Sequence, residues 1–300
     1  MDITVIGVPF NSDGSSRGVA RMPAALRDAG LVGQLNAAGH GVVDGGDVTF
    51  SEPVAARDPS SGIIALDSIV EIFAQVRERV AATMRSGRFP LVVAGECSVL
   101  LGSLAATRDA HGGVGLVFVD GHEDVWPPKS SPTGEVSDME LGLALGRHSH
   151  DVPAALGSEL PLIGVESVVA LGPRDYKEME DAGVSSMRSE LWFADDRQVA
   201  KATTETMARA LSHLEPVCDA LWLHVDLDVL STDALPAVDY RQPGGLSWEQ
   251  LERITELALG DRRVVGADVT IFNPDLDPVG EHARRIVQYL GNALTRTEES

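Results

Sequence analysis

Cysteine and basic residues are both scarce in this chain of 300 residues. The two cysteines, Cys97 and Cys218, are too few for a disulfide framework, which excludes the small disulfide-stapled class of protein. Lysine and arginine number 24 against 45 aspartates and glutamates, so the formal net charge is −21. Because an acidic surface repels phosphate backbones, nucleic acid is not expected as a partner.

Long apolar runs are also missing. No stretch reaches the roughly 20 apolar residues that cross a bilayer. The amino terminus opens with a strand-like run at residues 3–8, not with a basic segment followed by an apolar one. We therefore expect no membrane partner and no signal peptide, and the cytoplasm is the expected location. A hydrophobic content of 44% indicates a soluble globular protein.

Short apolar runs alternate with segments in which apolar residues recur every three or four positions, which predicts strands alternating with helices. This order favours an α/β fold of three layers, α/β/α, with a mostly parallel central sheet. No repeat or low-complexity linker divides residues 1–300, so we expect a single domain. The predicted strands are 2–8, 90–94, 114–119, 166–171, 220–225 and 263–269, and the predicted helices are 65–86, 98–109, 201–214, 247–259 and 279–296. Two segments rich in Pro, Ser, Asp and Gly, 50–62 and 124–137, are expected to be loops.

Three possible metal ligands follow the predicted strand 114–119 at alternate positions, namely Asp120, His122 and Asp124. Alternate side chains of an extended chain point the same way, so these three are expected to converge just past a strand end, where open α/β sheets keep their active sites. Asp226 and Asp228 follow the strand 220–225 in the same manner. Clustered buried carboxylates need cations, and two such clusters predict two divalent ions. Each cluster taken alone could also be a solvated loop with helix-capping aspartates.

Cys97 stands at a third strand end, in Gly95-Glu96-Cys97-Ser98. A cysteine there is more often a buried small hydrophobe. Its position beside two candidate ligand clusters nevertheless makes it a candidate ligand. A nucleophilic Cys97 would need a basic partner, which the sequence does not identify.

Taken together, these segments resemble the ureohydrolase family of arginases, agmatinases and formimidoylglutamases over nearly the whole chain. Gly95-Glu96-Cys97-Ser98 is similar to the family's Gly-Gly-Asp-His-Ser, residues 120–124 are similar to Asp-Ala-His-x-Asp, and residues 224–228 are similar to Ser-x-Asp-x-Asp. The amino-terminal segments 7–10, 17–19 and 23–27 look like the arginase opening. The resemblance implies an arginase-type fold in one arginase-like domain, 1–300.

The resemblance also implies a ligand set for two divalent ions, with manganese as the usual metal. One ion would be held by Cys97, Asp120, Asp124 and Asp226, and the other by Asp120, His122, Asp226 and Asp228. A hydroxide between the ions would attack a trigonal carbon. Because Cys97 replaces a histidine, zinc, iron or cobalt become possible. The alternative is that Cys97 is an unbound thiol beside a weak or empty position.

Several positions that select the substrate in arginases differ here. Ser137 stands where the family has a proton-shuttling histidine, and serine needs an activating partner for that role. His148 and His150 could replace the shuttle, or they could be exposed loop residues. Ile271 stands where the family has a guanidinium-binding glutamate, and its absence removes the main partner of a cationic guanidinium.

Two further differences concern the amino-acid end of the substrate. Lys177 falls where arginase has an aspartate, and a lysine there would repel an α-ammonium group. Trp126 is either a substrate-facing wall or a cover for its own loop. Candidate catalytic residues are therefore Asp124, Ser137 and His148, and candidate substrate-binding residues are Trp126, Lys177 and Ile271.

These residues predict a metal-dependent hydrolase of linear C–N bonds in an amidine- or guanidine-like small molecule, with L-arginine itself a poor substrate. The alternative is a metal-binding arginase-fold protein that does not hydrolyse and has a binding or regulatory role. Family resemblance also implies a homo-oligomer.

Overall fold

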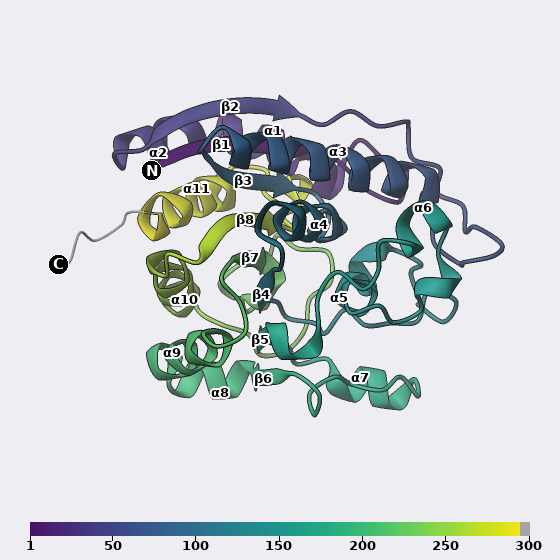
Figure 1. Ribbon diagram of the computed structural model, residues 1–300. Coiled ribbons are helices and arrows are strands. Elements are labelled where there is room, and N and C mark those ends of the chain that lie inside the picture. Colours follow the sequence, from purple (N-terminus) through teal and green to yellow (C-terminus); the bar gives the residue numbers. More distant parts are fainter. Residues whose placement is uncertain (295–300) are drawn as a thin grey trace.

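The computed structural model of the protein describes residues 1–294, and one central sheet of eight strands runs through it (Figure 1). The strands lie in the order β2-β1-β3-β8-β7-β4-β5-β6, and every pairing between neighbours is parallel. Parallel pairing requires crossover connections, which are supplied mostly by helices. The strands are β1 (Asp2–Val8), β2 (Gly41–Asp47), β3 (Phe89–Ala94), β4 (Gly115–Val119), β5 (Val168–Gly172), β6 (Trp192–Asp195), β7 (Leu221–Asp226) and β8 (Val264–Thr270).

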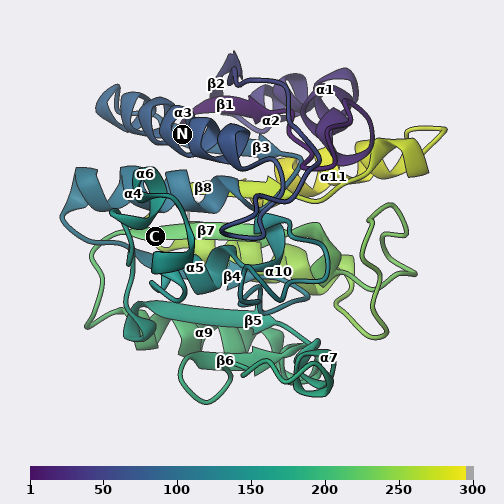
Figure 2. The ribbon, with the colours of Figure 1, turned by 90° about the vertical axis from the view of Figure 1, so that its right-hand side faces the viewer.

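Helices cover both faces of this sheet, as the α/β/α prediction requires. One apolar core lies between the sheet and α1, α2, α9, α10 and α11, and the second lies between the sheet and α3, α4, α5 and α6 (Figures 1 and 2). The helices are α1 (Met22–Asp28), α2 (Leu31–Ala37), α3 (Leu66–Arg85), α4 (Val99–His111), α5 (Glu140–Ala144), α6 (Ala154–Gly157), α7 (Tyr176–Asp181), α8 (Asp196–Lys201), α9 (Thr203–Leu214), α10 (Trp248–Gly260) and α11 (Glu281–Ala293).

The six predicted strands and the five predicted helices are all present, with ends that differ by a few residues. The last two residues of the predicted helix 279–296 lie outside the described residues. Two strands, β2 and β6, were not predicted, and both form edges of the sheet. None of the helices within residues 1–294 is long and apolar enough to cross a membrane.

A row of residues across the middle of the sheet positions the site. Phe118 of β4 lies opposite His224 of β7, which in turn lies opposite Asp268 of β8. All three side chains are completely buried. The sheet register, fixed by long stretches of apolar residues on both faces, therefore places two ionisable groups side by side in the core.

Candidate metal centre and substrate cavity

Four adjacent strands end at one edge of the sheet, and the predicted ligands follow them. β3 leads into Cys97, β4 into Asp120 and β7 into Asp226, while β8 lies between β3 and β7 and ends at Thr270. Because all four strands are parallel, their carboxyl ends meet. The structure thus brings together side chains that are up to 173 positions apart in the sequence, such as Cys97 and Thr270.

The predicted convergence is present, but the extended backbone that predicted it is wrong. Residues 120–124 are not a strand, and Asp124 has a positive φ of 47°. Asp228 lies in a turn of 3₁₀ helix, Leu227–Val229. Instead, each leading aspartate accepts a hydrogen bond from the backbone two residues later, from the N–H of His122 to Asp120 and from that of Asp228 to Asp226, each at 2.7 Å. These two Asx turns, not strand alternation, aim the ligands.

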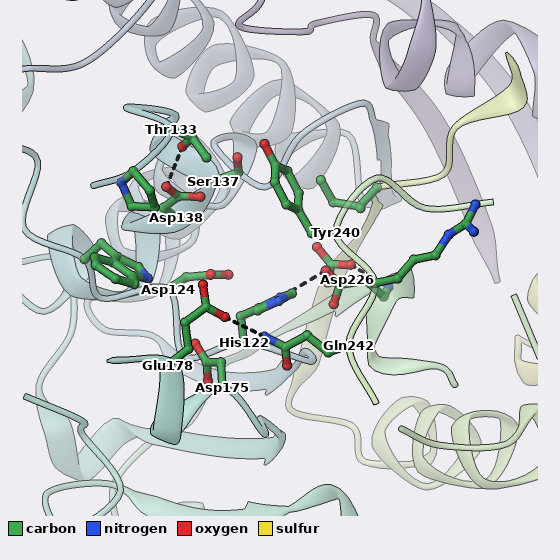
Figure 3. Close-up of a pocket in the computed structure, with 15 residues that line it drawn as sticks. His122, Asp124, Thr133, Ser137, Asp138, Asp175, Glu178, Asp226, Tyr240 and Gln242 are labelled. Atoms are coloured by element: carbon green, nitrogen blue, oxygen red, sulfur yellow. Dashed lines mark hydrogen bonds and ion pairs between the residues drawn. The ribbon is translucent and has the colours of Figure 1, made fainter. Parts of the chain in front are cut away.

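His122 joins the two aspartate clusters. Its Nδ1 lies 3.0 Å from Asp228 Oδ2 and 3.7 Å from Asp120 Oδ1. In Figure 3, His122, Asp124 and Asp226 face one space, with Ser137 and Tyr240 on its far side. One imidazole between two carboxylates is the arrangement expected for ligands of a common cation.

Cys97 lies beneath this space and is only 1% exposed. Its thiol donates to Asp226 Oδ2 at 2.8 Å and lies 3.0 Å from Thr270 Oγ1. Burial, and then the charge of Asp226, raise the pKa of the Cys97 thiol well above its ordinary value. A thiolate therefore needs a bound cation, and a nucleophilic role for Cys97 has no support because Cys97 does not line the cavity.

The carboxyl groups at this edge are crowded together, with too few cationic partners among the described residues for all of them to be ionised. Burial and then Asp120 and Glu140 raise the pKa of Asp124, and burial followed by Asp228 raises that of Asp226. Asp120 Oδ2 is buried with no hydrogen-bond partner. Orphaned oxygens and neutralised carboxylates are what a site built for divalent cations shows without them, so the residues present fit two such ions. The ligand set itself stays a prediction.

Two buried residues of this cluster, His224 and Glu140, were not predicted. Together with Cys97 and Asp120 they form a group whose ligand atoms all lie within 4.8 Å of one another. A signal for His224 was available, because a histidine two residues before Asp226 on a buried strand must share its face. Glu140 begins a helix 16 positions after Asp124, and nothing in the sequence pattern points it inward.

A cavity of about 270 Å³ opens above the cluster (Figure 3). Seven residues predicted for the site line it, namely His122, Asp124, Trp126, Ser137, Asp226, Asp228 and Ile271. Among the residues that the sequence did not indicate, the lining includes Asp138, Asp175, Glu178, Tyr240, Arg241 and Gln242. The volume lies just below the usual range for small-molecule sites, which indicates a small ligand.

Two residues predicted for catalysis or substrate binding, Lys177 and His148, do not reach this cavity. Lys177 is exposed on α7, where its neighbour Glu178 lines the cavity instead. His148 lies 3.6 Å from Asp151, and neither His148 nor His150 belongs to the lining. An α-helix turns by about 100° per residue, which is why counting along the sequence misplaced the Lys177 side chain relative to Glu178.

Ile271 does line the cavity, with a backbone that β-branched residues rarely adopt. Its φ is +64°, in the left-handed region, which costs about 1–2 kcal/mol for a residue with a branched Cβ. Its N–H donates to the carbonyl of Gly95 at 3.2 Å, which ties the end of β8 to the turn after β3. An apolar side chain held at this cost beside the ligand cluster is consistent with a functional position.

Comparison with known proteins identifies the fold and the family. The family model described as the arginase family matches residues 1–295. The chain belongs to the arginase family. It is 27% identical over 293 residues to an arginase of Brevibacillus brevis, covering 98% of this chain and 97% of that protein. The structure resembles the native arginase of Bacillus caldovelox at pH 5.6, with a TM-score of 0.85, 26% identity and 99% of each chain covered.

A second member of the family shares the fold at greater distance. Formimidoylglutamase from Bacillus subtilis superposes with a TM-score of 0.75 at 19% identity, covering 99% of this chain and 87% of that one. At this identity the likeness concerns the fold alone. Because a shared fold does not fix the function, the residues of this cavity must be interpreted individually.

Proposed function

We propose that this arginase-family chain is a metal-dependent hydrolase, acting as a single domain on a linear C–N bond of a small amidine- or guanidine-like molecule. The observation that carries the proposal is the set of buried, insufficiently neutralised carboxylates at the base of a small cavity. Cys97, Asp120, His122, Asp124, Asp226 and Asp228 are the proposed ligands of two divalent ions. Such ions would supply a nucleophilic water at neutral pH and positive charge for the transition state.

The chain's own residues would handle the protons. Asp124 faces both the cluster and the cavity, so we assign it to holding the nucleophile in place. Ser137 lines the cavity and donates to Glu135 Oε2 at 3.4 Å. Burial, and then Asp138, raise the pKa of Glu135 to about 7. A carboxyl with that pKa is the activating partner that a serine needs for proton transfer, so Ser137 with Glu135 takes the place of a titrating histidine.

The walls of the cavity suit a group less basic than the guanidinium of L-arginine. Ile271 offers no carboxylate at its own position, and Trp126 adds an apolar side chain to a lining that also contains acidic residues. An N-hydroxyguanidine, a formimidoyl group or an amide, each less basic than a guanidinium, fits such a wall better than L-arginine does. Lys177, being exposed and outside the lining, does not contribute to this selection.

The native metal and the assembly follow from the same proposal. Manganese is the metal that family membership suggests, whereas the sulfur of Cys97 favours zinc, iron or cobalt. A homo-oligomer is proposed on family resemblance.

The test is a turnover screen with metal-loaded protein. Full-length protein loaded separately with manganese, zinc, iron or cobalt is assayed for release of urea, ammonia or formamide from amidines, guanidines and amides. The proposal expects turnover of a substrate other than L-arginine. Efficient urea release from L-arginine overturns the substrate assignment, and metal binding without any turnover favours the alternative of a binding or regulatory protein.

A further inference from the structure

The buried row of Phe118, His224 and Asp268 fixes the orientation of the His224 imidazole ring. Asp268 accepts hydrogen bonds from the indole of Trp222 on one oxygen and from His224 Nδ1 on the other. The ring of Phe118 stacks on the imidazole, with centroids 5.0 Å apart and planes 16° apart. A carboxylate on Nδ1 directs the free electron pair of Nε2 away from it, which is how metal-binding histidines are oriented in proteins.

The free nitrogen of His224 points at the ligand cluster without a partner. His224 Nε2 is buried and makes no hydrogen bond, and the nearest charged atom, Asp120 Oδ2, lies 3.6 Å away and is likewise unpaired. This distance is too long for a hydrogen bond. The two atoms are aimed at a common point that neither of them fills.

Glu140 belongs to the same group, with a carboxylate oxygen within 4.8 Å of the ligand atoms of His224 and Asp120. It is the first residue of α5, which packs against α4 on one face of the sheet (Figure 1). Glu140 is 0% exposed, and neither of its oxygens has a hydrogen-bond partner. A buried carboxyl group in this state either keeps its proton or needs a cation to balance its charge.

We propose that His224 Nε2 and the Glu140 carboxylate, together with Cys97 and Asp120, hold one of the two ions. We call it the inner ion, because none of these residues lines the cavity. The inner position then differs from the ligand set drawn from family resemblance, because the histidine comes from β7 and an extra carboxylate comes from α5. The proposal rests on the metal binding described above but not on hydrolysis.

The geometry allows a closed tetrahedral site. The four ligand atoms lie within 4.8 Å of one another, and metal–ligand bonds of about 2.0–2.3 Å would place them about 3.3–3.8 Å apart. Small side-chain shifts therefore suffice. Of these four residues none lines the cavity, whereas His122 and Asp228 of the neighbouring group do.

This difference in access assigns different roles to the two ions. Four protein ligands and no open position are typical of a structural or charge-balancing ion. The outer group of Asp120, His122 and Asp228 offers three ligands beside the cavity, which leaves room for water or substrate. Sulfur and imidazole at the inner position select zinc, cobalt or iron over manganese there.

The test is a titration of metal-free, full-length protein with Co²⁺, followed by absorption spectra and by the number of ions bound. Tetrahedral cobalt with a thiolate absorbs strongly and shows a sulfur-to-metal charge-transfer band, whereas six-coordinate cobalt with oxygen ligands absorbs weakly. We expect one strongly absorbing cobalt ion, called the strong-type ion, and one weakly absorbing ion, called the weak-type ion. Glu140→Gln and His224→Gln should each weaken the strong-type ion by at least about 100-fold, and Asp268→Asn by about 10–100-fold.

Two controls make the result specific. Glu96→Gln removes an equally buried glutamate, next to Cys97 but bonded to Ser12, and should leave both ions bound as in wild type. His122→Asn should remove the weak-type ion and keep the strong spectrum. The inference is overturned if Glu140→Gln and His224→Gln bind cobalt with wild-type affinity and spectrum, as a purely imidazolium-bridged His224 would allow.

The wild-type spectrum tests the inference even if a variant does not fold. Two ions bound with only weak absorption would contradict the closed inner site and leave the hydrolase proposal standing. A strong-type ion in a protein that turns over no substrate would support the inner site and remove the hydrolase proposal.

Discussion

The base and the rim of the cavity follow different rules. The base, made of Cys97, Asp120, His122, Asp124, Asp226 and Asp228, lies at the ends of β3, β4 and β7 and is buried except for His122, which is partly exposed. The rim, made of Trp126, Ser137, Glu178, Tyr240, Arg241 and Ile271, comes from loops and short helices and is partly exposed apart from Ile271, which is buried just after β8. By the resemblance described above, five of the six proposed ligands in the base match the family's ligand types, whereas Ser137 and Ile271 in the rim differ from the expected arginase pattern. We infer that the base retains the chemistry and the rim sets the substrate.

The largest expected effect comes from the base. Asp120→Asn removes the carboxylate that faces both His122 and Cys97, so both ions should lose affinity. Losing several kcal/mol of metal assistance corresponds to a drop in kcat/KM of at least about 10³-fold. Steady-state kinetics together with elemental analysis measure both changes. If the variant lost metal but kept its activity, the ions bound by these residues would not be needed for hydrolysis.

Proton transfer at the rim should have the next largest effect. Ser137→Ala and Glu135→Gln are each expected to lower kcat by about 10²-fold, the lower end for a general acid–base group. His148→Asn should leave kcat unchanged, because His148 pairs with Asp151 outside the cavity. A larger loss from His148→Asn than from Ser137→Ala would reverse the assignment of the proton relay.

Restoring a carboxylate at the rim should shift substrate choice. Ile271→Glu adds a charged hydrogen-bond acceptor worth about 1.5–3 kcal/mol, which favours cationic guanidines over neutral amides by about 10–100-fold in kcat/KM. The left-handed backbone conformation already has a steric cost for the β-branched isoleucine. Glutamate is not β-branched, so it adds no backbone strain. Ile271→Gln is the matched control without charge, and equal selectivity in both variants would show that the carboxylate is not what matters.

The smallest effect concerns the stability of the metal-free protein. Burial raises the pKa of Asp175 to about 7 and that of Glu96 to about 8. These folded-state values exceed the unfolded value near 4, so the folded protein holds protons that the unfolded chain releases. Stability should therefore fall as pH rises from about 4 to about 8. Thermal unfolding in chelator should give a Tm several degrees lower at pH 8 than at pH 5.

Bound metal should reverse that pH dependence. Ions at about 100 times their Kd add about 2.7 kcal/mol, or roughly 5 °C in Tm. Because their carboxylate ligands must ionise, the gain should be larger at pH 8 than at pH 5. A gain in Tm that is the same at both pH values would mean that these carboxylates are not the ligands.

Sequence patterns predicted the interior of the fold better than its edges. The six strands with apolar runs were found, because buried parallel strands are hydrophobic on both faces. β2 (Gly41–Asp47) contains three glycines and two aspartates and is mostly exposed, and β6 (Trp192–Asp195) has four residues. Both are edge strands, which need no continuous apolar run.

The site divides in the same way. Candidate ligands at the ends of buried strands, such as Asp120 and Asp226, were predicted because strand ends converge in any parallel sheet. Glu140 was missed because its direction depends on how a long loop folds back. Lys177 was placed by its match to a family segment and His148 by its nearness to Ser137 in the sequence, and neither lines the cavity. The direction of a side chain on a loop or a short helix does not follow from its position in the sequence.

Comparative turnover by protein of known metal content tests the central claim most directly. Full-length protein carrying two ions per chain is assayed with L-arginine, an N-hydroxyguanidine, a formimidoyl compound and an amide under the same conditions. The account predicts hydrolysis, with kcat/KM higher for at least one of the less basic compounds than for L-arginine. L-arginine as the best substrate, or no hydrolysis with both ions bound, would contradict it.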